Sequence, residues 1–394
     1  MNSIKQIAAI TLLSLRSVPQ RIGSSLVIIT GIAGVVAVLL SVLAMSAGLT
    51  ATMERAGRAD RAIVLRKGAD SESASTLSRD AAAVIAAAPG IRKMPNRQPM
   101  VSPEVLAVAS LRKKGDGSRA EVTVRGISPM AFAVRPELTL TAGRQPRTGL
   151  REVIVGRSAQ AEFEGLELGG RVPIRDGEWS IVGQFDTHGD ARESELLVDA
   201  DTLQSAYQST LFQSVTVQLE SADAFDALNR AVTTNPTLAS LDVQREQDYY
   251  RQQSQRLARV LSVVAYLIGG IMALGAMFGA INTMYSAVSV RTKEIATLRA
   301  MGFGPAGMVV SVLIEAEIFS LIGASLGAAI AWVAFNGNTI STIQGSGQLI
   351  THLSIGGSLF WVAVIWGSAI GLVGGLFPAV RAARLPVATA LRAV

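Results

Sequence analysis

Long apolar runs constrain the fold of this chain more than any other feature. Four runs stand out, and only the third contains charged residues, the glutamates Glu315 and Glu317. About 20 apolar residues in a helix cross a bilayer core of about 30 Å, and each run is longer than that. We therefore predict an α-helical membrane protein with four transmembrane helices. The runs are Ile22–Met53, Val260–Val290, Pro305–Phe335 and Gly357–Val380.

The first run could also be the apolar core of a signal peptide, with Lys5, Arg16 and Arg21 as its basic flank. A signal core usually has about 7–15 residues and is followed by a small-residue cleavage site. This run is far longer, and no clear A-x-A motif follows it. We therefore expect it to be retained as a helix.

Lysine and arginine are concentrated on one side of the predicted helices. Three positive residues and no acidic ones precede the first run, three follow the second run against a single glutamate, and three lie in the tail. The segment 336–357 has neither Lys nor Arg. Positive residues favour the cytoplasmic side, so we predict that both termini and the 291–304 loop are cytoplasmic.

The polar middle of the chain, residues 47–259, is predicted to be a domain on the other side of the membrane. It holds 27 positive and 27 acidic residues, so the net charge of +6 arises outside it. The excess of Lys and Arg lies in the short segments next to the spans and is explained by their cytoplasmic location, so it gives no reason to expect a nucleic-acid partner. A segment of about 210 residues is too long for a loop and needs a core of its own.

Strand and helix patterns are mixed in this middle segment, which indicates an α+β fold inserted between the first and second helices. The Asp176-Gly177 pair between two strand-like segments predicts a hairpin turn. The predicted strands are Glu121–Arg125, Glu152–Val155, Arg171–Arg175, Trp179–Val182 and Ser214–Leu219, and the predicted helices are Ser78–Ala87, Ala222–Thr233 and Gln244–Arg259.

The last of these helices continues into the second apolar run without a Pro or Gly, and the first run stays apolar to Met53. Ten extra helical residues add about 15 Å, so both helices can extend beyond the bilayer as a stalk; the alternative is that their ends tilt or fray. The predicted order is a cytoplasmic segment 1–21, helix 22–46, external domain 47–259, helix 260–289, short cytoplasmic helix 290–304, helix 305–335, short external loop 336–357, helix 358–380 and cytoplasmic tail 381–394.

Residues suited to catalysis are scarce. The chain has no cysteine and two histidines, His188 and His352, so thiol chemistry and multi-histidine metal sites are excluded. His188 lies between Asp186 and Asp190 in a Gly-containing loop, which is more typical of a solvated turn than of an acid–base or metal site. No G-x-x-x-x-G-K-[ST] motif occurs. We predict no catalytic residues, metal or cofactor on this chain.

The segment Val290–Phe303 is the most informative motif. As a short helix it places Ile295, Leu298 and Met301 on one face, with most of the charged residues elsewhere, and Gly302 ends it. An amphipathic cytoplasmic helix between two spans can dock a soluble partner. The alternative is a membrane-surface loop with ordinary positive-inside charges.

This segment resembles the R-x-K-E-I-x-x-L-R-A-x-G coupling segment of FtsX/MacB-like ABC transporter permeases, the type VII family. Phe377–Arg392 resembles the closing P-A-x-R-A-A-x-x-P-x-x-A-L-R of that family, and Leu313–Ala316, followed by Gly323 and Gly327, resembles its third span. The middle segment resembles a MacB-type periplasmic core. That last resemblance lies in Gly126, Gly143-Arg144, Glu152–Gly156 and Trp179–Gly183.

The resemblance implies a multi-pass permease of the bacterial inner membrane that works by mechanotransmission, with its large domain in the periplasm. A separate ABC ATPase would carry ATP and Mg. It also implies a second permease copy, identical or not, and a periplasmic adaptor with an outer-membrane channel. The implied ATPase-coupling residues are Arg291, Lys293, Glu294, Ile295, Leu298, Arg299 and Gly302.

Other functions stay open beside this efflux function. Within the family, a lipoprotein-extracting LolC/LolE-like permease is the second choice, and a cell-division FtsX-like one is disfavoured by the size of the external domain. A non-transporting membrane receptor or scaffold is the alternative of another class. A secondary transporter is disfavoured, since almost no ionisable groups lie in the spans.

Glu315 is the intramembrane residue of most interest. It lies about 13 Å along the third helix, and carboxylates inside a membrane helix are functional candidates. We expect it to position the helix beside the coupling segment, with Arg291 or Lys293 as its partner, rather than to line an ion pathway. Glu317 points to another face. Small residues four apart, such as Gly275/Gly279 and Gly323/Gly327, predict close helix packing within the chain or at a dimer seam.

Overall fold

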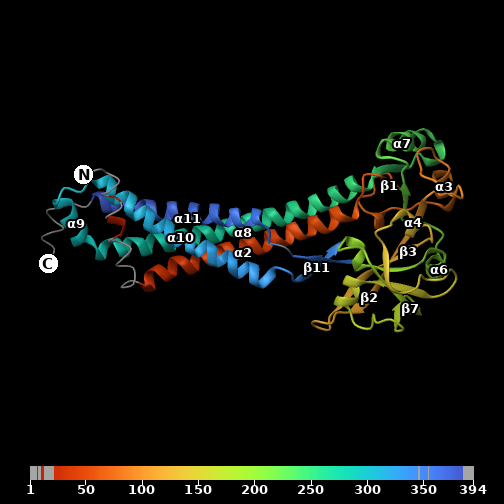
Figure 1. Cartoon of the computed structure of the whole chain (residues 1–394), viewed down its shortest axis with the longest axis horizontal. Coiled ribbons are helices and arrows are strands. Elements are labelled where there is room, and N and C mark those ends of the chain that lie inside the picture. The colour runs from red at the N-terminus through yellow and green to blue at the C-terminus, as the bar shows by residue number, and fades with distance from the viewer. Residues whose placement is uncertain (1–6, 8–9, 13–21, 345–346, 354, 385–394) are drawn as a thin grey trace. The chain divides into compact units, whose positions relative to one another are not determined.

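The structure is a computed structural model that describes residues 7, 10–12, 22–344, 347–353 and 355–384 (Figure 1). The chain divides into two compact units. The helical unit comprises residues 1–47, 259–338 and 353–394, and the polar unit comprises residues 48–258 and 339–352. Each unit has its own core, and the two are described in turn.

Within the described residues, four helices have the length and hydropathy of membrane spans, which confirms the predicted number. All four exceed the roughly 20 residues that a bilayer needs, and α2 with 35 residues and α8 with 45 are the longest. A fifth, short helix, α9, follows α8. The bounds are α2 Ile22–Ala56, α8 Glu246–Val290, α9 Thr292–Ala300, α10 Pro305–Phe335 and α11 Gly357–Arg384.

Glycines let the helices of the helical unit pack closely. A Cβ on Gly323 would lie 2.8 Å from the carbonyl oxygen of Ile29, and one on Gly327 would lie 2.5 Å from that of Ala33, so α10 lies directly on α2. The predicted Gly323/Gly327 pair therefore packs within the chain. Gly275 and Gly279 have no described atom within 4 Å of the same position, so that pair does not pack against another helix within the described part of the chain, and its place at a dimer seam stays a prediction.

A ten-stranded mixed sheet forms the polar unit, in the order β10-β1-β9-β2-β3-β8-β5-β7-β4, with β6 on β7. The β3–β8 and β5–β7 pairs are parallel and the other pairs are antiparallel. The strands are β1 Arg61–Arg66, β2 Val101–Arg112, β3 Arg119–Ile127, β4 Thr139–Gly143, β5 Glu152–Gly156, β6 Arg171–Ile174, β7 Gly177–Asp186, β8 Leu196–Asp199, β9 Ser214–Gln218 and β10 Leu241–Arg245.

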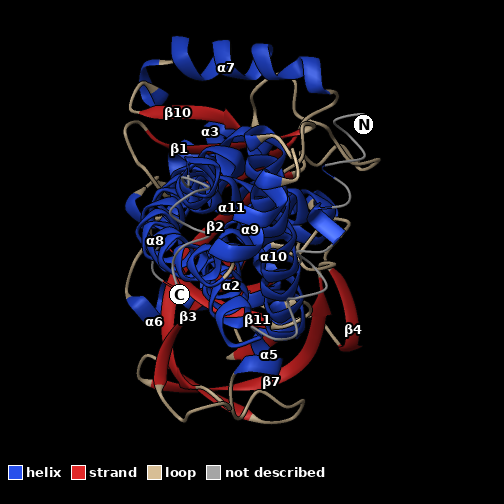
Figure 2. Ribbon diagram, turned by 90° about the vertical axis from the view of Figure 1, so that its left-hand side faces the viewer, coloured by secondary structure: helices blue, strands red, loops and turns tan. Residues whose placement is uncertain are grey.

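Short helices lie between these strands, so the predicted α+β class is confirmed. Ser78 caps α3 by accepting a hydrogen bond from the amide of Ala81. Helix α7 covers the edge strand β10, as Figure 2 shows. The helices are α3 Arg79–Ala86, α4 Ala131–Val134, α5 Arg157–Glu162, α6 Ala200–Tyr207 and α7 Phe225–Thr234, with short 3₁₀ turns η2 Glu72–Ala74, η3 Ala191–Ser194, η4 Ala222–Ala224 and η5 Pro236–Leu238.

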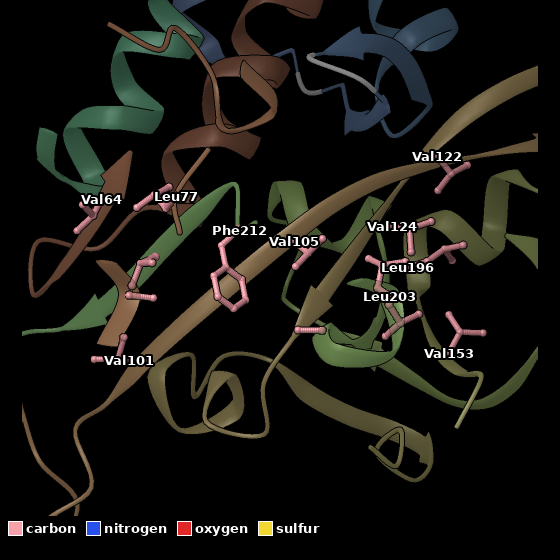
Figure 3. Close-up of a cluster of buried hydrophobic side chains, with 14 of the residues drawn as sticks. Val64, Leu77, Val101, Val105, Val122, Val124, Val153, Leu196, Leu203 and Phe212 are labelled. Carbon is pink, nitrogen blue, oxygen red and sulfur yellow. The ribbon is translucent and has the colours of Figure 1, made fainter. Parts of the chain in front are cut away.

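The main core lies on one face of the sheet, where strands contribute alternate apolar residues. Figure 3 shows Val105 of β2, Val124 of β3 and Leu203 of α6 in this cluster, together with Phe212 from the loop before β9. A second, smaller cluster contains Phe185 and has other members on β3, β5 and β8. The sheet is therefore covered by apolar side chains on both faces.

The predicted hairpin forms, but its turn was misplaced. Ile174 pairs with Gly177, so the two turn residues are Arg175 and Asp176, and Arg175 takes the left-handed conformation at φ 53°. Gly177 is the first residue of β7. Its missing side chain leaves room for the guanidinium of Arg151, which a Cβ would overlap. The glycine therefore serves a close contact and not the turn.

The segment 336–357, predicted as a short loop, contains a β-hairpin that belongs to the polar unit. Strands β11, Thr339–Gln344, and β12, Gly347–His352, pair antiparallel. Ile350 is buried in the main core of the polar unit, and its amide donates to Ser194 Oγ over 3.0 Å. Antiparallel pairing and the packing of Ile350 into this core make the segment a hairpin, so the prediction of a loop was wrong.

Candidate coupling site and buried charge network

Helix α9 has one buried face and one exposed face. Ile295 is 7% exposed, and Leu298 packs against the same apolar cluster of the helical unit. Met301, which we expected on this face, is 63% exposed because the helix ends at Ala300 and Gly302 turns the chain at φ 94°. Pro305 then begins α10 at its first position.

The predicted coupling residues divide between these two faces. Lys293, Glu294 and Gly302 are exposed, and Arg299 is partly exposed. Ile295 and Leu298 point inward and support the helix, so a docked partner would not contact them first. The surface that α9 offers is therefore polar and of mixed charge.

An ion pair holds the start of α9 against α10. Arg291 Nη1 lies 3.0 Å from Glu315 Oε2, and the two side chains are 11% and 4% exposed. Of the two partners considered for Glu315, the structure selects Arg291, and Lys293 is exposed instead. Glu317 lies on another face of α10, where its Oε2 faces the position of Gly371 on α11.

A small cavity lies beneath α9, entirely within the helical unit. It has a volume of about 60 Å³ and is bounded mainly by apolar side chains of α8, α9 and α10. The Arg291–Glu315 pair lies in its wall. The predicted coupling residue Glu294 also borders this cavity. The apolar lining includes Met284, Val288, Ile295, Leu298, Met308 and Val312.

A second constellation, in the polar unit, was not predicted from the sequence. Four arginines and five glutamates from distant parts of the chain form one network of ion pairs. Eight of the nine residues are buried, and Glu137 is partly buried. The members are Arg61, Arg125, Arg135, Arg192, Glu72, Glu104, Glu137, Glu195 and Glu246.

Arg125 of β3 is at one end of this network. It binds both carboxylate oxygens of Glu195, at 2.6 and 2.8 Å, and also lies 2.5 Å from Glu72 and 2.7 Å from Glu104. Glu104 in turn accepts from Arg135 over 2.6 Å. Burial alone would raise the pKa of Glu104, but Arg135, Arg192 and Arg125 outweigh it and hold that pKa well below its usual range.

Glu246, the first residue of α8, is at the other end. Its carboxylate accepts from Arg61 over 2.6 Å and from Arg135 over 3.1 Å. Arg61 also donates to the carbonyl oxygen of Ala56, the last residue of α2. A Cβ on Gly57 would lie 2.7 Å from the Cα of Gln247, so the end of α2 packs against the start of α8. The network therefore fixes the ends of both long helices to the sheet.

The loop before η3 connects to this network. Asp190 caps η3 by accepting from the amide of Arg192 over 2.9 Å, and it accepts from the Thr187 hydroxyl over 2.5 Å. Burial raises the pKa of Asp190 to about 6, against these hydrogen bonds. His188 is exposed at φ 61°. Within the described residues, no group of three or more His, Cys, Asp or Glu is placed to hold a metal.

Comparison with known proteins identifies the family. The family model of the MacB-like periplasmic core domain matches residues 24–235, and that of the FtsX-like permease C-terminal domain matches residues 266–387. The first match covers most of α2 and the polar unit up to Asn235, and the second covers α8 from Tyr266 and all of α9, α10 and α11. The chain belongs to the FtsX/MacB-like family of type VII ABC transporter permeases.

Individual relatives agree with this assignment. The chain is 27% identical over 206 residues to the uncharacterized ABC transporter permease YknZ of Bacillus subtilis, covering 50% of this chain and 49% of the relative. It is 25% identical over 294 residues to the macrolide export ATP-binding/permease protein MacB of Pasteurella multocida, covering 68% and 42%. The chain thus spans about half or less of the length of these relatives.

A solved structure of the periplasmic region of MacB from Actinobacillus actinomycetemcomitans is also similar. The matched region covers 51% of this chain and 95% of the MacB structure, with 16% sequence identity and a TM-score of 0.39. The four apolar helices and the polar unit fit a multi-pass inner-membrane protein with a periplasmic domain.

Proposed function

We propose that this chain is the permease subunit of an ATP-driven transporter, and that its ATPase docks on α9 of the helical unit. The single observation that carries the proposal is the construction of α9. Its inner face is anchored by buried Ile295 and by the Arg291–Glu315 ion pair, while Lys293 and Glu294 face outward. A helix fixed to α10 and exposed on its other side moves with the helices when a partner pushes it.

Transmission of that motion to the polar unit follows from the length of α8. This helix begins at Glu246, inside the buried charge network, and continues without a break to Val290, next to Arg291. At 1.5 Å per residue, its 45 residues extend about 67 Å. ATP binding would act as a population shift, favouring one arrangement of the helices by differential affinity. Both long helices would serve as the stalk.

The remaining parts of the proposal come from the family. The termini and α9 face the cytoplasm, as the positive residues indicate, and the polar unit faces the periplasm. A second permease copy completes the transporter, and the word export in the names of the MacB relatives favours export over lipoprotein extraction. A periplasmic adaptor and an outer-membrane channel are part of the proposal because the resemblance to the family implies them. ATP and Mg belong to the ATPase, which we place on a separate chain.

Affinity capture of the full chain in mild detergent tests the docking site. We expect an ABC ATPase, identified by mass analysis and by vanadate-sensitive ATP hydrolysis. Its recovery should fall when the exposed charges of α9 are reversed by Lys293→Glu with Glu294→Lys. Asp116→Lys, on an exposed turn of the polar unit, is the control and should leave recovery unchanged.

Two results would contradict the proposal. Capture of the chain with no ATPase under these conditions would favour the receptor or scaffold function. Undiminished recovery after the double reversal would show that the ATPase binds elsewhere on the chain.

A further inference from the structure

A polar cavity within the polar unit is separate from the coupling site. It has a volume of about 90 Å³, and one water needs about 10–15 Å³ of such space, so it has room for several waters or one small polar group. Its walls come from η2, β2, β3, η3, the first turns of α8 and strand β12. The cavity therefore lies between the buried charge network and the hairpin that joins α10 to α11.

The charged side chains that line the cavity already balance one another. Glu72 and Glu195 both bind Arg125, and the fourth charged residue is Arg192. Two negative and two positive groups leave no net charge in the wall. Burying a free ion among them would cost its desolvation without a matching partner. The occupant that fits is an uncharged group.

Three polar atoms of residues that line the cavity have hydrogen-bonding capacity that no described residue uses. Arg192 is 2% exposed, and its Nε–H has no acceptor among the described residues. Gln348 Oε1 of β12 is buried and has no donor among them either. The Tyr249 hydroxyl accepts from the Glu72 amide and from Gln253 Nε2, so its own proton remains to be donated. An unsatisfied buried polar atom costs about 1–3 kcal/mol.

From these atoms we propose that the cavity binds a carboxamide group. Its carbonyl oxygen has two lone pairs, which match the two leftover donors, Arg192 Nε–H and the Tyr249 hydroxyl. Its N–H matches the leftover acceptor, Gln348 Oε1. The group is neutral, small enough for the volume, and could come from the backbone of a peptide or from an Asn or Gln side chain. The site belongs to the polar unit and does not depend on an ATPase.

Ligand-observed saturation-transfer NMR on the full chain in detergent tests this site. The probes are N-methylacetamide, which mimics a peptide group, and propionamide, which mimics an amide side chain. Glycerol and acetate are the controls for a hydroxyl and for a charged group. We expect saturable binding of at least one amide and none of the controls, and the amide that binds more tightly identifies the source.

Two variants connect the signal to the cavity. Gln348→Leu removes the leftover acceptor and Tyr249→Phe removes one donor, and each should weaken amide binding by about tenfold, the value of one hydrogen bond. Gln145→Leu, an exposed residue outside the cavity, should have no effect. If Tyr249→Phe disturbs the fold, the measurement on Gln348→Leu still shows whether the amide binds in the cavity.

Three results would overturn the proposal. No amide binding would mean that water alone occupies the cavity. Equal binding of glycerol would mean that the site does not select an amide, and binding that survives Gln348→Leu unchanged would place the amide elsewhere. All three leave ATPase capture unaffected, so this proposal and the proposed function fail separately.

Discussion

The two units of the chain stabilise their interiors by different means. In the described part of the helical unit, the helices meet through an apolar cluster with close glycine contacts, and one ion pair, Arg291–Glu315, joins α9 to α10. In the polar unit, nine charged side chains form a continuous network beside a β-sheet core. A membrane helix cannot bury many charges at an acceptable cost, whereas a folded domain can pair them with one another.

This difference suggests a division of roles. Close glycine contacts allow helices to slide or tilt with few specific bonds to break. A network of short ion pairs, in contrast, fixes the ends of α2 and α8 in one geometry, because moving one member leaves others unpaired. Rearranging the helices of the helical unit would therefore break fewer specific contacts than rearranging the charge network of the polar unit.

The largest effect is expected from breaking the network. Arg125→Met leaves Glu72, Glu104 and Glu195 without their shared partner, so the free energy of unfolding of the polar unit should fall by about 3–5 kcal/mol. Denaturant unfolding of the full chain, followed by near-UV circular dichroism, measures the change. Arg79→Met is the matched control, since the exposed Arg79–Asp201 pair should contribute at most about 1 kcal/mol. Equal effects of the two variants would show that the network is not rigid.

A smaller effect is expected from Asp190, and it depends on pH. Its pKa in the folded protein is raised by burial to about 6, above 3.8 for the free side chain, so the folded state holds its proton more tightly. This contribution to stability is fully present below pH 3.8 and is lost as the pH rises through 6. From these two pKa values the loss amounts to about 3 kcal/mol.

Asp190→Asn keeps the acceptor for the amide of Arg192 but cannot ionise. Its stability relative to the wild type should therefore rise between pH 4 and pH 7 and stay level above that. Unfolding curves of both proteins at each pH give the difference in their free energies of unfolding. The contributions of the other carboxylates are the same in both proteins and cancel in this difference. Parallel pH profiles for the two proteins would mean that Asp190 is ionised throughout.

The corresponding test in the helical unit is the Arg291–Glu315 pair. Removing either partner, by Arg291→Met or Glu315→Gln, should lower the thermal stability of the unit by about 2 kcal/mol, the value of a hydrogen bond between charged groups. It should also reduce ATP hydrolysis that depends on the permease. The double variant should lose less stability than the sum of the losses of the two single variants, since neither charge is left without its partner. Full additivity would argue against the pair.

The sequence was informative where a single segment determines the outcome. Apolar run length was enough for the four membrane helices. Helix rise and the family resemblance predicted that Glu315 lies beside the coupling segment, but they left Arg291 and Lys293 both open as its partner. The charge network could not be predicted, because Arg61 and Glu246 are 185 residues apart and lie in segments whose charges look like solvated surface. The hairpin at 339–352 was missed for a similar reason, since only tertiary contacts such as Ile350 with Ser194 distinguish it from a loop.

The smallest expected effect concerns the junction between that hairpin and the network. Gln348 Oε1 is buried without a donor among the described residues, so Gln348→Leu should raise the free energy of unfolding by about 1 kcal/mol, since the desolvation cost of one polar atom is removed. Gln145→Leu, on an exposed loop, should change it by less than about 0.5 kcal/mol. Thermal unfolding of the two variants and the wild type shows whether Gln348 Oε1 lacks a hydrogen-bond donor in solution. A loss of stability in Gln348→Leu would mean that this oxygen is hydrogen-bonded in solution, and the hairpin would then be fixed to the network by a polar contact as well as by its apolar residues.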